Sequence, residues 1–173
     1  MPIRDKLLPE FDQEMSNTRK MLGLVPEDHL EYQPHPKSMA LGRLASHTAE
    51  LPGWTVSIMQ MEALELDPGK HQPFMPQTRK ELLETFDKHV REARNALAAA
   101  TDEQLAVIWT LKVPGKVVFS MPRAAVLRAM VMSHMIHHRA QLGVYLRLRE
   151  IAIPGMYGPS ADEMKFWQTP PKA

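Results

Sequence analysis

Hydrophobic residues recur three or four positions apart in four long stretches of the chain, which is the spacing of one face of an α-helix. Ser38 is a suitable N-cap for the second stretch, and Gly23 is a suitable end for the first. Four long helices joined by polar loops are typical of a four-helix bundle, so we predict an all-α fold of that kind. The predicted helices cover Asp5–Met21, the stretch after Ser38, Thr78–Ala100, and Pro122 to about Glu150.

The segments between these stretches carry turn residues. Pro52-Gly53 interrupts the second stretch and predicts a kink there. Prolines in 26–36 and 64–76 predict connecting loops. Thr101 followed by Gln104 is a capping pattern that predicts a brief helical turn.

A different pattern precedes the fourth helix. In Ile108–Ser120, two short runs rich in β-branched and aromatic residues flank Pro114-Gly115, which predicts a short irregular or β-ribbon insertion. The proline-containing tail, residues 151–173, is predicted to be irregular. The length of 173 residues suits one domain, so residues 1–173 are expected to form a single helical unit.

Histidines lie on the apolar faces of two predicted helices. At about 100° per residue from Leu127, His134 and His138 fall in the middle of the apolar arc of the fourth helix. His47 shares one side of the second helix with Leu44 and other apolar residues. Side chains four apart on a helix can reach the same ion through bonds of ~2 Å. We therefore predict that His47, His134 and His138 bind one divalent metal ion.

The alternative is that each histidine is simply buried and bonded to a carbonyl or hydroxyl oxygen. No Glu follows His134, so the H-E-x-x-H pattern of metalloproteases is absent. His137 points about 60° away from His134 and is expected to flank the site, while Gln141 is expected to orient a ligand or a bound water. The remaining histidines are predicted to lie at the surface: His29, His35, His71 and His89.

Composition excludes several classes of function. The net charge is +1, with 21 basic and 20 acidic residues, and the basic residues form no stripe, so nucleic-acid binding is not expected. No apolar run approaches the ~20 residues of a membrane-spanning helix, and the charged N-terminus does not resemble a signal peptide. We therefore expect a cytoplasmic protein without membrane contact. The chain has no Cys, which excludes disulfides, thiolate zinc sites and a cysteine nucleophile.

Two strings containing these histidines resemble the DinB-like (DinB/YfiT-like) metal-binding bundle family. They are Leu44-Ala-Ser-His47 and His134-Met-Ile-His137-His138-Arg139-Ala140-Gln141, the second of which departs from the family pattern at Ala140, where Gly is usual. The resemblance implies a four-helix bundle, often a homodimer, that holds nickel, zinc or another divalent ion on three histidines. It also implies that some members are enzymes that use a low-molecular-weight thiol.

Three neutral histidines would leave a metal with an open position, which is the arrangement of catalytic sites. The first hypothesis is a metal-dependent transferase acting on a small-molecule substrate with a low-molecular-weight thiol cosubstrate. The alternatives are a hydrolase that uses metal-bound water and a non-catalytic bundle that binds metal or a small ligand. No catalytic residue is assigned. Glu50 is a candidate for proton transfer, although a solvated helix residue is the favoured interpretation. Tyr157 and Asp162 are candidates for capping the site, and packing and helix capping explain them as well.

Overall fold

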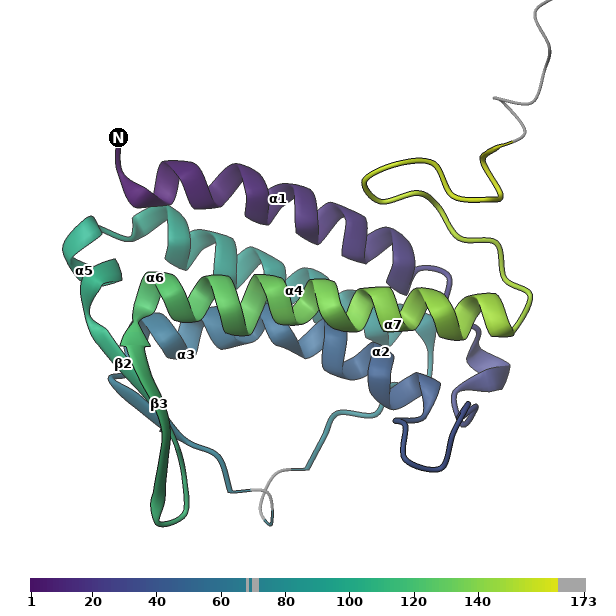
Figure 1. The fold of residues 1–173 in the computed structure, drawn as a ribbon, viewed down its shortest axis with the longest axis horizontal. Helices are drawn as coiled ribbons and strands as arrows, with labels where there is room; N and C mark the ends of the chain where they lie inside the picture. Colours follow the sequence, from purple (N-terminus) through teal and green to yellow (C-terminus); the bar gives the residue numbers. More distant parts are fainter. Residues whose placement is uncertain (68, 70–71, 165–173) are drawn as a thin grey trace, which may run out of the picture.

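The computed structural model describes residues 1–67, 69 and 72–164. Four helical segments lie side by side along the long axis of the molecule, and a small sheet lies at one end (Figure 1). Predictions for Pro68, His71 and the last nine residues of the tail lie outside the described residues. The helices are α1 (Ile3–Leu22), α2 (Leu41–Glu50), α3 (Trp54–Gln60), α4 (Arg79–Ala99), α5 (Asp102–Ala106), α6 (Arg123–Val126) and α7 (His134–Leu148), with 3₁₀ turns at Glu27–His29 and Leu51–Gly53 and π-helical turns at Leu127–Ser133.

The predicted helices are present, and their ends show which capping predictions hold. Thr78 caps α4, and Thr101 begins α5 with the expected capping box. Ser38 does not cap α2, so that prediction is wrong. The first N–H groups of α2 instead donate to the preceding connector, Leu41 to the carbonyl of Tyr32 and Gly42 to that of Leu30, both at 2.8 Å.

The second helical segment is broken where Pro52-Gly53 predicted it. The 3₁₀ turn at Leu51–Gly53 joins α2 to α3 without reversing the chain. A Cβ atom on Gly53 would lie 3.1 Å from the ring of His89 in α4, so glycine permits the close approach of the two segments. Pro52 itself is buried.

The fourth helical segment is less regular than predicted. It begins at Arg123, because Pro122 is the last residue of a strand, and it ends at Leu148. Between α6 and α7 it passes through π-helical turns, which hold more residues per turn and are frequent at functional sites. These turns lie directly before His134.

A three-stranded sheet of order β1-β2-β3 closes one end of the molecule. Strands β2 (Ile108–Val113) and β3 (Lys116–Pro122) form the predicted antiparallel ribbon. Strand β1 (Ala63–Glu65) pairs with β2 in parallel and lies in a segment that we predicted to be a loop. The chain is therefore mostly helical with a small sheet. Strand β1 was not predicted because its three residues are too few to show an alternation of apolar and polar positions.

The hydrophobic core lies between the four helical segments. The apolar stripe predicted for α4 is buried at Leu82, Phe86, Ala93 and Leu97. Among the described residues, no helix is both long enough and apolar enough to span a membrane. The large apolar side chains that are almost completely buried include Phe11, Leu22, Leu41, Leu44, Leu51, Ile58, Phe86, Leu105, Trp109 and Met135.

Candidate metal centre

Three histidines from two neighbouring helices converge in the interior. His47 lies on α2, and His134 and His138 lie one turn apart on α7, which packs against α2. The Nε2 atom of His134 lies 3.5 Å from that of His47 and 2.8 Å from that of His138. One ring nitrogen from each residue lies within 4.8 Å of the others, and within the described parts of the chain this is the group that could hold a metal ion. We call it the three-His group.

The geometry of the three-His group fits a divalent ion. Metal–nitrogen bonds of ~2.0–2.1 Å in a tetrahedral site would place ligand nitrogens roughly 3.3 Å apart, which lies between the observed separations of 2.8 and 3.5 Å. His138 Nδ1 lies 2.8 Å from Oε1 of Gln141, and an amide oxygen can only accept, so Nδ1 carries the proton. The unprotonated Nε2 of His138 then points at the centre of the group, which is the tautomer that binds metal. The prediction for Gln141 is therefore supported.

Burial keeps two of these rings neutral. It lowers the pKa of His134 and of His138, and Gln141 opposes that effect on His138 only in part. The backbone of Met130 raises the pKa of His134 and so partly opposes the effect of burial. Nδ1 of His134 nevertheless has no well-aligned hydrogen-bond partner among the described residues. Neutral imidazole is the form that binds metal.

A pocket of ≈ 450 Å³ opens beside the three-His group. His47 and His134 line it, whereas His138 is buried behind them. The group is thus accessible to a small molecule from one side. The walls of the pocket come from α2, α3, the segment after β1, strand β2, the π-helical turns and α7. The lining residues are Arg43, His47, Glu50, Trp54, Leu66, Asp67, Leu111, Met130 and His134.

Glu50 is half-buried and lines the pocket, but its carboxylate is already hydrogen-bonded. One carboxylate oxygen accepts from Nη1 of Arg43 at 3.1 Å, and the other accepts from the backbone N–H of Phe74 at 3.2 Å. Arg43 was not among the residues predicted for the site. Its position four residues before His47, on the same face of the helix, is a pattern that would have identified it.

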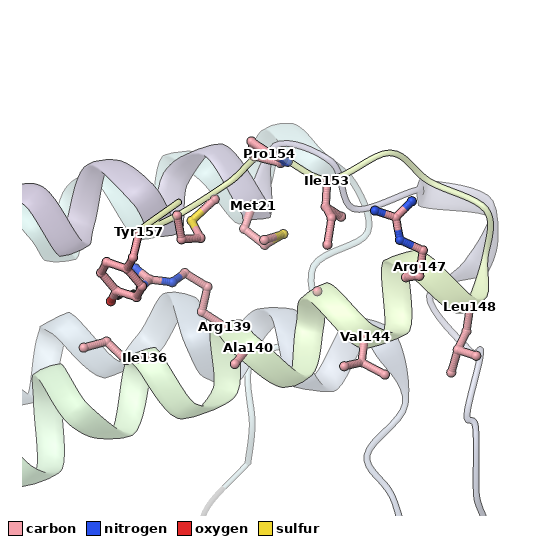
Figure 2. Close-up of a pocket in the computed structure, with 12 residues that line it drawn as sticks. Met21, Ile136, Arg139, Ala140, Val144, Arg147, Leu148, Ile153, Pro154 and Tyr157 are labelled. Carbon is pink, nitrogen blue, oxygen red and sulfur yellow. Dashed lines mark hydrogen bonds between the residues drawn. The ribbon is translucent and has the colours of Figure 1, made fainter. Parts of the chain in front are cut away.

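Tyr157 and Asp162 do not cap the three-His group, and the alternative, that they have packing roles elsewhere, agrees with their contacts. The Tyr157 hydroxyl donates to the carboxylate of Glu14, and Asp162 pairs with Arg147. Tyr157 lines a second pocket of ≈ 450 Å³ between α7 and the segment that follows it (Figure 2). The segment after α7 folds back along the face of this helix that lies away from the three-His group. Its path could not be predicted from the local sequence.

The other histidines differ in their surroundings. His137 is exposed beside His138, as predicted for a flanking residue, and His35 is exposed. His29 and His89 are half-buried instead of exposed. Nδ1 of His89 lies 3.0 Å from the carbonyl oxygen of Ala49, and Nε2 of His29 accepts from Arg149 at 3.0 Å.

The sequence of the whole chain identifies its family. A family model described as the DinB family matches residues 1–172. The chain belongs to the DinB family. The protein YrdA of Bacillus subtilis (strain 168) is 27% identical over 173 residues, which cover 97% of this chain and 96% of that protein.

Solved structures show the same fold. A DinB-like protein from Bacillus cereus ATCC 10987 has a TM-score of 0.69 at 24% identity, covering 90% of this chain and 98% of that one. The DinB-like protein YjoA from Bacillus subtilis has a TM-score of 0.66 at 19% identity, covering 87% and 96%. The DinB fold therefore extends over most of the chain, and the resemblance inferred from the histidine strings is confirmed.

Proposed function

We propose that this DinB-family chain is a metal-dependent enzyme whose divalent ion, nickel or zinc, is held by His47, His134 and His138 inside a four-helix bundle. The observation that carries the proposal is the convergence of the three Nε2 atoms at the end of an open pocket. Gln141 supports it by fixing the tautomer of His138.

The first candidate reaction is transfer to a low-molecular-weight thiol. A divalent ion on three histidines supplies a Lewis acid that activates water or stabilises a thiolate. The chain contributes no thiol, because it has no Cys, so the thiol would arrive as a cosubstrate. His47 and His134 line the pocket, so an ion held by the three-His group would face a substrate bound there. Hydrolysis by metal-bound water is the alternative reaction of the same site.

A non-catalytic metal- or ligand-binding protein is the second candidate. It is favoured by the state of Glu50, the carboxylate one turn from His47, which is already bonded to Arg43 and to the Phe74 N–H. A carboxylate held in this way is less available as a general base. Two further properties stay predictions, namely the cytoplasmic location and the homodimer that the resemblance implies. Sedimentation of the purified protein tests whether it is a dimer.

Metal analysis tests the proposal directly. Tag-free protein loaded with Zn²⁺ or Ni²⁺ and then desalted is expected to retain one ion per chain. His138→Ala should lose that ion while keeping its helical circular dichroism, and His137→Ala, the exposed neighbour, should retain it. Wild-type metal content in His138→Ala would refute the assignment. Assays of an electrophile with and without added thiols, on loaded protein, then separate transfer from hydrolysis.

A further inference from the structure

Resting on the proposed metal centre, we propose that the pocket beside the three-His group selects a small, uncharged and largely apolar molecule that presents one metal-binding group to the histidines. The proposal concerns the class of ligand. It depends on the residues that form the outer walls of the pocket, which belong to different parts of the fold.

Four large apolar side chains form these walls: Trp54, Leu66, Leu111 and Met130. They come from α3, the end of β1, strand β2 and the π-helical turns. A volume of ≈ 450 Å³ lies within the range of roughly 300–1,000 Å³ that is usual for small-molecule sites. An apolar ligand body would therefore bury its surface against these four side chains.

The sheet holds one of these walls in place. Leu111 lies opposite Leu64 in the β1–β2 pairing, and the N–H of Leu66 donates to the carbonyl of Lys112 at 2.9 Å. Leu111 is only 6% exposed. Backbone pairing thus positions both leucines beside the histidines, and a wall built on strands is more rigid than one built on a free loop.

The charges in the pocket oppose an anionic ligand body. Among the described residues that line the wall, Arg43 is the cation, and its charge is balanced by Glu50 at 3.1 Å. Asp67 adds a second carboxylate to the same wall. The positive charge of a bound ion would be met by the ligand's own metal-binding group. Because Arg43 is already paired with Glu50, an anionic ligand body would have to compete with Glu50 for this guanidinium, so an uncharged body is favoured.

Three hydroxamic acids test this class on zinc-loaded protein, with binding measured by calorimetry. Acetohydroxamic acid carries the metal-binding group alone, benzohydroxamic acid adds an apolar ring, and 4-carboxybenzohydroxamic acid adds a charge to that ring. We expect benzohydroxamic acid to bind at least tenfold more tightly than acetohydroxamic acid, and the carboxylated ring to bind more weakly than the plain one. Affinities of the three probes for free zinc correct for differences in the binding group.

A matched pair of variants locates the effect. Leu66→Asn should remove most of the advantage of the phenyl ring, whereas Leu148→Asn, at a 53% exposed position on α7 outside this pocket, should preserve it. Thermal melting checks that both variants are folded. Equal binding of the first two probes, or tighter binding of the carboxylated probe, would overturn the proposed ligand class while leaving the metal centre standing. Protein that takes up no zinc would instead refute the proposed function.

Discussion

Two faces of α7 bury polar groups, and they satisfy them in different ways. On the face toward α1, Arg139 is 2% exposed and pairs with the Glu14 carboxylate at 2.7 Å. The same guanidinium donates to the Glu14 carbonyl and the Thr18 hydroxyl at 3.1 Å, and to the Tyr157 hydroxyl at 2.6 Å. Figure 2 shows Arg139 and Tyr157 side by side above α7. We call these four residues the Arg139 network.

On the face toward α2, the three-His group has the opposite character. Its nitrogens point at one another, and Nδ1 of His134 lacks a well-aligned partner among the described residues. A network in which every charge is paired stabilises the fold and leaves little for a ligand to gain. A cluster of imidazole nitrogens around one centre is the arrangement that an ion would complete. One face of α7 is therefore structural, and the other carries the proposed binding site.

The largest expected effect is on the structural face. Glu14→Ala leaves the buried Arg139 charge unpaired, which typically costs about 3–5 kcal/mol of unfolding free energy. Glu10→Ala is the matched control, since Glu10 lies one turn earlier on α1 and pairs with Arg128 at the surface, where such pairs contribute about 0–1 kcal/mol. Urea denaturation measures both, and metal content should stay at the wild-type value. Equal losses in the two variants would remove the structural role of the Arg139 network.

The next effect falls on the binding face. Gln141→Ala removes the acceptor that orients His138, and the loss of such partners commonly lowers metal affinity by about 10–100-fold. Gln141→Glu keeps an acceptor at this position and should retain most of the affinity. Competition with a chromogenic chelator measures the change. Since Gln141 is exposed, the urea midpoint of the metal-free variant should hardly move. Unchanged metal affinity in Gln141→Ala would show that the tautomer of His138 is fixed by other means.

The two faces were not equally predictable from the sequence. His134 and His138 could be placed because they interrupt an apolar stripe on one helix, and helical periodicity depends only on neighbouring residues. His47 could be placed on its own helix in the same way. The proximity of the two helices did not follow from either stripe. It was an expectation from the predicted bundle and from the resemblance to the DinB-like family.

The Arg139 network could not be predicted in this way. Its ion pair joins residues 125 positions apart, and its tyrosine comes from a segment with no periodic pattern. Glu14 was nevertheless detectable as a polar residue three positions after Phe11 and four before Thr18, on the buried side of α1. Strand β1 and the π-helical turns left no local trace, because both are set by the partners that they pack against.

A third, smaller effect is the pH dependence of stability that the histidines on the α2 face of α7 produce. Burial lowers the pKa of His134 and of His138 below 6.5, so the unfolded chain binds more protons than the folded one as the pH falls through that range. The metal-free protein should therefore be less stable at pH 5.5 than at pH 7.5. Thermal melting at the two values measures this, and His134→Gln combined with His138→Gln should show a weaker dependence. An equal dependence in that variant would assign the effect to other groups.

The smallest effect concerns the hydroxyl that closes the Arg139 network. Burial and the bond to Glu14 raise the pKa of Tyr157, so the phenol stays protonated and donates to Glu14 at neutral pH. Tyr157→Phe removes this hydroxyl, but its ring can remain against Arg139, whose guanidinium lies 5.5 Å from the ring centroid in the wild type. The salt bridge between Arg139 and Glu14 also remains, so the loss should be about 1 kcal/mol, well below that of Glu14→Ala.

Urea denaturation measures that loss, and zinc affinity provides the second reading. Tyr157 reaches the face of α7 toward α1, where its hydroxyl bonds with Arg139 and Glu14, and neither of these residues belongs to the three-His group. Zinc affinity of Tyr157→Phe should therefore equal that of the wild type. A fall in zinc affinity as large as that of Gln141→Ala would mean that the two faces of α7 are coupled through the helix, and the division of roles between them would no longer hold.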